Sequence, residues 1–379
     1  MKKQKNSLFK YFKLFVIVSL ILIWKPSAIA SINENPPKII ISYHNATDFK
    51  IIGKVLKTPT YSRLPVQAEK EVRPAVWSLS KNSAGLAIRF SSNSSIIKIR
   101  WTLKKNRVKG NMTPIASNGL DLYAYTKDRW QFVGVAIPGK EVVNEATVIA
   151  DMTKENREYL LNLPLYEGVE KLEIGIEENA TISMPRQAII DQERPVIFYG
   201  TSITQGASAS RPGLTYAALL ERKTNKEVIN LGFSGNGRFE KEVAQFIMPS
   251  NPSVIILDCT PNSAPDTILT NLPETLAYIQ SVNDSVPIIL VESIVRDYAY
   301  FKENNPSTFG TLSYIQAQND ALKKVYLNNK NKNLFYVSNN DLIGQDNEAT
   351  VDGTHFNDLG NYRMYQFLLP IIEKLLTHR

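Results

Sequence analysis

Cysteine and histidine are scarce in this sequence of 379 residues. Cys259 is the only cysteine, which excludes an internal disulfide and any cysteine-based metal site. The three histidines are His44, His355 and His378, so a histidine that acts as a base has few possible positions. Hydrophobic residues make up 43% and charged residues 21%, which is typical of folded globular proteins, and the length allows two domains.

The first 30 residues have the pattern of a secretory signal peptide. Five lysines precede an apolar run over residues 14–24, and the small-residue pattern Ala28-Ile29-Ala30 follows. The run is shorter than the roughly 20 residues that a spanning helix needs, so a retained membrane anchor is the lesser alternative. We expect a secreted or bacterial periplasmic protein with no stable membrane insertion after cleavage, and the lack of disulfides suits those compartments when the core is large.

The basic charge belongs to this leading segment. Residues 1–30 contain six lysines and no acidic residue, so their removal lowers the formal net charge from +8 to +2. A nearly neutral mature chain gives no indication of a nucleic-acid partner.

The remaining chain changes its hydrophobic period near residues 186–195. Residues 31–186 show short alternating strands between turn signals, which predicts an all-β sandwich; the clearest strands cover residues 86–90, 96–101, 120–125, 130–135 and 169–176. Residues 187–379 alternate continuous apolar strands with amphipathic helices, which predicts a parallel sheet covered on both faces. The expected strands are 195–199, 228–231, 253–258, 287–292 and 334–337; the expected helices are 214–222, 239–247, 266–282, 312–327 and 360–376.

Polar residues follow several of these strands at their carboxyl ends, where α/β proteins bind their ligands. Ser202 follows the first strand, Gly232 the second and Asn262 the third, and Asp352-Gly-Thr-His355 precedes the last helix. His355 is the only histidine in a loop of this half. A lone histidine is more often structural, but Asp352 three residues earlier can orient the ring toward a serine.

These residues could together form a site in which an activated serine attacks an acyl group. Ser202 would be the nucleophile, His355 its base and Asp352 the orienting acid. The backbone N–H groups of Ser202 and Gly232 and the side-chain amide of Asn262 would stabilise the oxyanion. Taken singly, Gly232 also fits an ordinary strand-to-helix turn and Asn262 a helix cap. The better interpretation of Cys259 is a buried, inert thiol.

The motifs resemble the four blocks of the SGNH (GDSL-type) hydrolases, in order. The blocks stand here as residues 200–204, 230–235, 258–262 and 352–355, and Gly119-Leu-Asp-Leu-Tyr123 resembles the branch with an N-terminal Gly-x-Asp-Leu-Tyr β domain. The resemblance implies a flavodoxin-like three-layer fold and ester hydrolysis at Ser202, His355 and Asp352, without metal or other cofactor. Two departures are Thr201, where the superfamily often has Asp, and Cys-Thr-Pro-Asn in the third block.

We therefore expect a carboxylic ester hydrolase that removes short acyl groups, foremost acetyl, from a small-molecule or glycan ester. The hypothesis of a glycan substrate is based on the expected secretion, on the accessory β domain and on the substrates common in the family that the chain resembles. The alternatives are a lipid or lysophospholipid esterase and a non-catalytic glycan-binding protein on a hydrolase scaffold. The sequence does not indicate the sugar, the oligomeric state or the role of the β domain.

Overall fold

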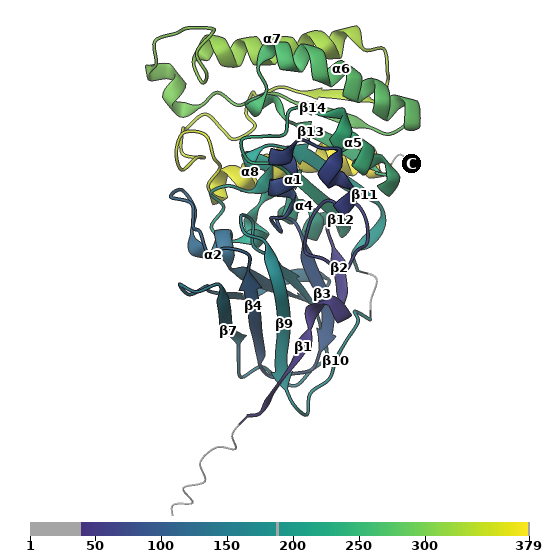
Figure 1. The fold of residues 1–379 in the computed structure, drawn as a ribbon, viewed down its shortest axis with the longest axis vertical. Helices are drawn as coiled ribbons and strands as arrows, with labels where there is room; N and C mark the ends of the chain where they lie inside the picture. The colour runs from purple at the N-terminus through teal and green to yellow at the C-terminus, as the bar shows by residue number, and fades with distance from the viewer. Residues whose placement is uncertain (1–38, 187–188, 378–379) are drawn as a thin grey trace, which may run out of the picture. The chain divides into compact units, whose positions relative to one another are not determined.

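The computed structural model describes residues 39–186 and 189–377. The expected signal peptide, residues 1–30, lies outside the described residues. Residues 40–379 form one compact unit that contains three sheets. Figure 1 shows the antiparallel sheets of the first half and the helix-covered sheet of the second half.

The first half contains two antiparallel sheets. One has the strand order β1-β9-β4-β7 and the other β10-β3-β8-β5-β6, with β2 paired to β3. The strands are β1 (Ile41–Asn45), β2 (Lys50–Ile52), β3 (Ala87–Ser92), β4 (Ile97–Leu103), β5 (Leu120–Thr126), β6 (Arg129–Ala136), β7 (Val143–Ile149), β8 (Arg157–Asn162), β9 (Val169–Glu177) and β10 (Ile182–Ser183). Phe90 and Leu122 of one sheet share a buried core with Trp101 and Ile174 of the other, as expected for a sandwich.

The second half contains a parallel sheet of order β12-β11-β13-β14-β15. Its strands are β11 (Asp191–Gly200), β12 (Lys226–Gly232), β13 (Val254–Asp258), β14 (Ile288–Val291) and β15 (Leu334–Val337). Counted from the first of these strands, the order is 2-1-3-4-5, which is that of flavodoxin-like folds. The predicted three-layer α/β fold preceded by a β sandwich is therefore confirmed.

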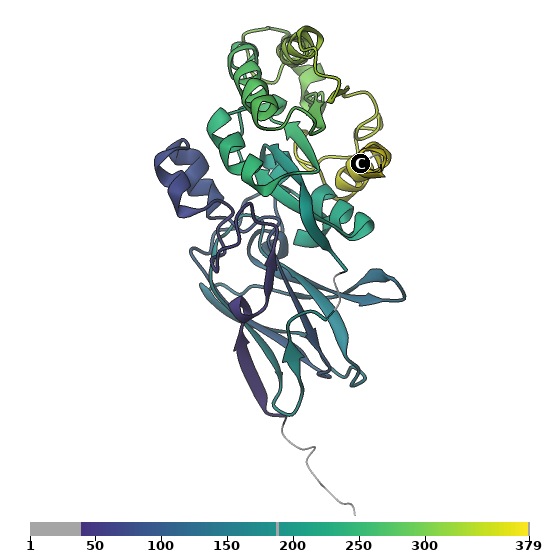
Figure 2. The ribbon, with the colours of Figure 1, turned by 90° about the vertical axis from the view of Figure 1, so that its right-hand side faces the viewer.

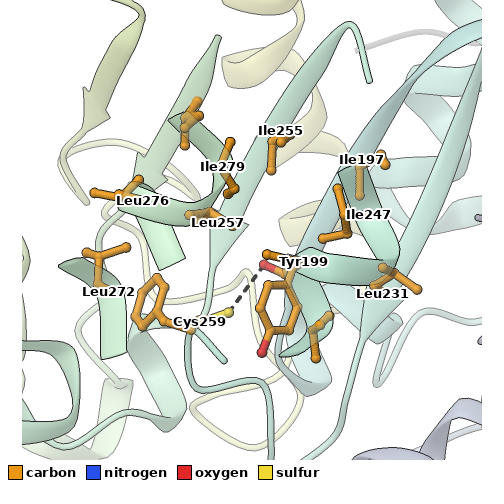
Figure 3. Packing of buried hydrophobic residues seen from close by; sticks show 14 of the residues in the cluster. Ile197, Tyr199, Leu231, Ile247, Ile255, Leu257, Cys259, Leu272, Leu276 and Ile279 are labelled. Atoms are coloured by element: carbon orange, nitrogen blue, oxygen red, sulfur yellow. Dashed lines mark hydrogen bonds between the residues drawn. The ribbon is translucent and has the colours of Figure 1, made fainter. Parts of the chain in front are cut away.

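Helices cover both faces of this sheet because the strands are apolar on both faces. In β11, Ile197 and Tyr199 pack with α5 (Lys241–Ile247), α6 (Pro265–Val282) and α7 (Leu312–Asn328). Val196 and Phe198 point to the other face and pack with α4 (Tyr216–Thr224) and α8 (Asp358–Thr377). Figure 3 shows the first of these cores, with Cys259 among its apolar side chains.

Two expected helices begin later than the sequence pattern indicated. Phe239 has a φ of +57°, which a helical residue does not adopt, so α5 begins at Lys241. The side chain of Thr215 accepts a hydrogen bond from the N–H of Ala218, and this cap begins α4 at Tyr216.

A segment of the first half belongs to the core of the second. Helix α1 (Pro74–Ser80) contributes Val76 to the core beneath α5 and α6, and Val55 and Leu64 lie in the same core. Figure 2 shows α1 (purple) beside elements of the second half. The two halves therefore share buried contacts, although the sequence suggested a boundary near residue 186.

Candidate active site

Ser202 begins the short helix α3 (Ser202–Gln205) directly after β11. Thr201 caps this helix: its side chain accepts from the N–H of Ile203, and the Thr204 hydroxyl accepts from the N–H of Thr201. The turn needs a glycine before it, because a Cβ on Gly200 would lie 2.0 Å from Thr204 Oγ1 and 2.7 Å from a backbone oxygen. Thr201, which stands where the superfamily often has Asp, thus serves as the N-cap of α3.

Ser202, His355 and Asp352 are connected by a chain of hydrogen bonds, with His355 in the middle. Ser202 Oγ is 2.8 Å from His355 Nε2, and His355 Nδ1 is 2.7 Å from Asp352 Oδ2. The other carboxylate oxygen, Asp352 Oδ1, accepts from the backbone N–H groups of Thr354 and His355 at 3.1 and 2.9 Å. The loop itself is tightly closed, because the Val351 N–H donates to the His355 carbonyl at 2.9 Å. The structure therefore brings the three expected residues together, although Ser202 and His355 are 153 positions apart in the sequence.

The environment keeps Asp352 ionised. Partial burial alone would raise the pKa of this carboxyl, but hydrogen bonds from the backbone and ring of His355, and one from Asn111, lower its pKa below the usual value. An ionised Asp352 accepts the Nδ1–H of His355 and leaves Nε2 without a proton, facing Ser202. This tautomer is the one that can take a proton from the serine hydroxyl.

The three expected oxyanion donors differ in their availability. The Ser202 N–H is the first of α3, and the first N–H groups of a helix have no intrahelical partner. Asn262, in a 3-10 turn after β13, donates one side-chain hydrogen to the carbonyl of Asn236 at 2.5 Å. The amide has a second hydrogen, so this bond does not exhaust it.

Gly232 is the least available of the three. Its N–H donates to Asn230 Oδ1 at 2.9 Å, and a Cβ on it would lie 2.1 Å from the Gln205 nitrogen. The glycine therefore packs against α3 with its N–H already used. Gly235, in the following turn, has a φ of +67° and open space where a Cβ would stand, so its backbone is the accessible one in this loop.

Asn111 also reaches the site, and the sequence reasoning missed it. This residue lies in the loop between β4 and α2 (Pro114–Asn118) of the sandwich half. Its Nδ2 donates to Asp352 Oδ2 at 2.9 Å and lies 3.2 Å from His355 Nδ1. The surrounding loop is a polar stretch with no motif, so no sequence signal marked this asparagine.

Arg211 and Cys259 make structural contacts. Arg211 Nη1 is paired with Asp121 Oδ2 at 2.7 Å and also donates to the Tyr123 hydroxyl. Cys259 is fully buried, its thiol donates to the Tyr199 carbonyl at 3.4 Å, and burial raises its pKa well above the usual value (Figure 3). The expected burial of this thiol is thus confirmed, and its lack of reactivity stays a prediction.

A groove of about 630 Å³ lies beside the His355 loop. It is formed by residues that follow β14 and β15, including Tyr300, Phe301, Asn339, Asn340 and Gln345. Asp297 joins the groove to the His355 loop, because its carboxylate accepts from Thr350 Oγ1 at 2.6 Å and its N–H donates to the Gly353 carbonyl at 3.0 Å. Aromatic faces and side-chain amides thus line a hollow next to the histidine loop.

Two searches of the described residues gave negative results. Within residues 39–186 and 189–377, no three His, Cys, Asp or Glu side chains are grouped so that they could hold a metal ion. In the same ranges, no helix has both the length and the apolar character that crossing a membrane requires.

Comparisons with known families cover both halves of the chain. The model of the GDSL-like lipase/acylhydrolase family matches residues 193–373, and the GxDLY model, described as the N-terminus of SGNH-hydrolase-type esterases, matches residues 41–182. A GDSL-like lipase of known structure from Bacteroides ovatus is 37% identical, with a TM-score of 0.82 over 89% of this chain and 98% of its own. The chain belongs to the GDSL-like lipase/acylhydrolase family. It is accordingly a carboxylic ester hydrolase by class.

More distant structures share the fold of this GDSL-like hydrolase. The salicylyl-acyltransferase SsfX3 of a tetracycline biosynthetic pathway is 16% identical, with a TM-score of 0.70 over 89% of this chain and 98% of its own. A family two carbohydrate esterase from Clostridium thermocellum, in complex with cellohexaose, is 10% identical, with a TM-score of 0.54 over 77% and 93% of the two chains. A comparison with curated protein sequences gives no match.

Proposed function

We propose that this GDSL-like hydrolase is a secreted serine esterase that removes short acyl groups, foremost acetyl, from a carbohydrate. The proposal depends on one observation, the hydrogen-bonded chain of Ser202, His355 and Asp352. Ser202 Oγ lies 2.8 Å from His355 Nε2, and His355 Nδ1 lies 2.7 Å from Asp352 Oδ2. A non-catalytic scaffold has no need for these contacts, so they count against a purely glycan-binding protein.

In the proposed reaction, His355 Nε2 takes the hydroxyl proton as Ser202 Oγ attacks the ester carbonyl. The negative charge on the carbonyl oxygen is stabilised by the Ser202 N–H and the free hydrogen of the Asn262 amide. Gly232 stays a predicted third donor that must first release Asn230, and Gly235 is the accessible substitute in the same loop.

The remaining steps return the proton and the acyl group. His355 gives its proton to the departing alcohol oxygen as the carbon–oxygen bond of the ester breaks, which leaves the acyl group on Ser202. A water molecule then attacks the acyl-enzyme while His355 takes one of its protons. Collapse of this second intermediate releases the carboxylic acid and returns the proton to Ser202 Oγ. Asp352 orients the ring and stabilises its charged form throughout.

The carbohydrate part of the proposal rests on the groove beside the histidine loop. The groove lies outside β14 and β15, which are the second and third strands from β11. Neighbouring strands are about 4.8 Å apart, so the groove begins roughly 10 Å from Ser202 along the sheet edge. That distance suits a sugar unit beyond the esterified one, with its apolar ring face on Tyr300 or Phe301 and its hydroxyls at Asn340 or Gln345. The carbohydrate esterases that share this fold are consistent with that choice.

The proposal is tested with the protein from Ser31 onward and p-nitrophenyl esters. Ser202→Ala is expected to lose about a thousandfold or more in kcat/KM for the acetyl ester. Ser250→Ala is the matched control, because Ser250 precedes β13 and so lies at the opposite edge of the sheet. Equal rates for wild type and Ser202→Ala would refute the serine mechanism, and a preference for octanoyl over acetyl esters would favour the lipid esterase.

Secretion is tested separately. Expression of the full chain in a bacterium, followed by intact-mass measurement of the exported protein, is expected to show a new N-terminus at Ser31. A protein that stays with the membrane fraction at its full mass would support the retained anchor instead.

A further inference from the structure

The side chain of Asn111 connects the sandwich half to Asp352. Its Nδ2 donates to Asp352 Oδ2 at 2.9 Å, the same oxygen that accepts from His355 Nδ1 at 2.7 Å. The two residues are 241 positions apart, so the contact exists only because the two halves pack together.

The backbone of Asn111 is fixed to the second half by neighbouring bonds. Ser208 Oγ donates to the Asn111 carbonyl at 2.8 Å, and Thr113 Oγ1 donates to the Ser210 carbonyl at 2.6 Å. Ser210 is held in turn by Asp358 through its N–H and its hydroxyl, at 2.8 and 2.6 Å. Ser208 adopts a φ of +70°, which is uncommon for a residue with a side chain, so the surrounding structure must hold it there. The loop that carries Asn111 is therefore anchored to the second half at Asn111 itself and again at Thr113.

The Asn111 bond completes the set of donors around Asp352. Oδ1 accepts from two backbone N–H groups, and Oδ2 accepts from the His355 ring and the Asn111 amide. The Asp352 carboxylate thus accepts four hydrogen bonds, and its rotation would break several of them. Hydrogen bonds to a charged acceptor are also stronger than neutral ones, so each contributes to the fixed position.

We infer that Asn111 is a positioning residue through which the sandwich half orients Asp352, and through it the His355 ring, for attack by Ser202. The inference rests on the proposed function, and it gives the β half an indirect part in the reaction, through the position of Asp352. Asn111 itself touches neither Ser202 nor the reacting atoms.

Two titratable groups of the described residues act on Asp352. His355 is the direct partner, and Tyr166 of the sandwich half interacts with Asp352 through space. Burial raises the pKa of Tyr166 far above its usual value, so this phenol stays neutral in the range where the enzyme would work. The charge at Asp352 therefore acts on His355 without a competing acid or base from Tyr166.

Two variants of Asn111 separate positioning from a role in loop stability. Asn111→Leu removes the donor at similar size, and we expect kcat for p-nitrophenyl acetate to fall about tenfold with KM little changed. Asn111→Asp places a second carboxylate beside Asp352, which favours the protonated His355 ring. The acid limb of the kcat/KM profile should then move to higher pH. Asn106→Leu is the matched control, since Asn106 lies in the same loop but donates to Gly139 and Glu141 within the sandwich half.

A second readout needs no activity. With three histidines in the chain, the His355 ring resonance can be assigned by NMR, and Asn111→Asp should move its titration midpoint to higher pH while Asn106→Leu leaves it in place. The inference is overturned if neither the midpoint nor the acid limb moves in Asn111→Asp. It is also overturned if Asn106→Leu lowers kcat as much as Asn111→Leu does. A wild-type protein without esterase activity would refute the proposed reaction. If Asn111→Asp still moved the His355 midpoint in that case, the contact that positions the ring would stand.

Discussion

The carboxylate of Asp121 is fully buried and paired with Arg211 Nη1 at 2.7 Å. Asp121 belongs to the Gly-x-Asp-Leu-Tyr motif of β5, and Arg211 to the second half of the chain. The same oxygen of Asp121 accepts from the Gly213 N–H at 2.9 Å, and its other oxygen accepts from Asn162 Nδ2 at 2.8 Å. The motif therefore fastens the sandwich to the loop that follows α3, the loop that also carries Ser208 and Ser210.

This pairing predicts a large loss of stability in Asp121→Asn. Removal of one charge leaves Arg211 without its partner in a mostly buried place, which costs about 3 kcal/mol in the free energy of unfolding. Urea denaturation followed by tryptophan fluorescence measures the loss. Glu155→Gln is the control, since Glu155 is 70% exposed beside Arg157 and such surface pairs contribute about 1 kcal/mol or less. Similar losses in the two variants would show that the Asp121 pair does not hold the halves together.

A buried carboxyl on α4 predicts a pH-dependent stability. Glu221 accepts a hydrogen bond from the Val228 N–H at 3.0 Å, and burial raises its pKa from 4.5 to about 8. The folded protein therefore retains a proton that the unfolded chain has released above pH 4.5. The protonated Glu221 therefore favours the folded state fully below pH 4.5, and this contribution to the free energy of unfolding is lost as the pH rises from 4.5 toward 8.

Glu221→Gln should remove this loss. The melting temperature of the variant, relative to wild type, is expected to rise by about 2 °C or more between pH 6.5 and pH 8.5. The comparison starts at pH 6.5 because buried Asp258, whose pKa burial raises to about 6, has a slope of the same sign below that pH. Parallel melting curves for the two proteins across this range would contradict a protonated Glu221.

The amide of Asn262 predicts a loss in kcat when it is removed. Asn262→Ala takes away one oxyanion donor, and such a loss costs about a hundredfold in kcat with little change in KM. Asn271→Ala is a suitable control, since its side chain donates to the Arg238 carbonyl on the exposed surface of α6. A kcat within threefold of wild type in Asn262→Ala would remove this residue from the oxyanion site.

The groove predicts a substrate-dependent effect of its aromatic residues. Tyr300 and Phe301 are 61% and 90% exposed, so their replacement by alanine should leave the fold unchanged. We expect the double variant to raise KM for acetylated xylan oligosaccharides about tenfold, equivalent to about 1.4 kcal/mol of binding, and to leave p-nitrophenyl acetate unaffected. Tyr43→Ala, on β1 of the sandwich, is the control. Equal effects on both substrates would argue against a sugar site in the groove.

Much of the fold followed from hydrophobic period alone. Strands such as Val254–Asp258 are continuous apolar runs, and only a sheet covered on both faces buries such runs completely. The convergence of Ser202 and His355 followed as well, because carboxyl ends of parallel strands meet at one edge. Edge strands of the sandwich, such as Val143–Ile149, carry a weaker alternation and were not identified.

The contacts between the halves could not be predicted. Asn111 and Arg211 lie in polar loops whose partners are distant in sequence, and nothing local indicates which carboxylate each meets. The hydrogen bond of the Gly232 N–H could not be predicted either. This N–H donates to the side chain of Asn230, two residues away, and the sequence does not indicate which way that side chain points. Tertiary packing decides such contacts.

The proposed reaction depends on a Ser202 hydroxyl that is activated for acylation, and covalent labelling measures that reactivity. Diethyl p-nitrophenyl phosphate transfers its phosphoryl group to an activated serine and releases p-nitrophenolate. We predict about one equivalent of p-nitrophenolate per chain, with the diethylphosphoryl group on the peptide that contains Ser202 and no label in Ser202→Ala. A label on Cys259 or on another serine, or equal release by Ser202→Ala, would show that Ser202 is not the nucleophile.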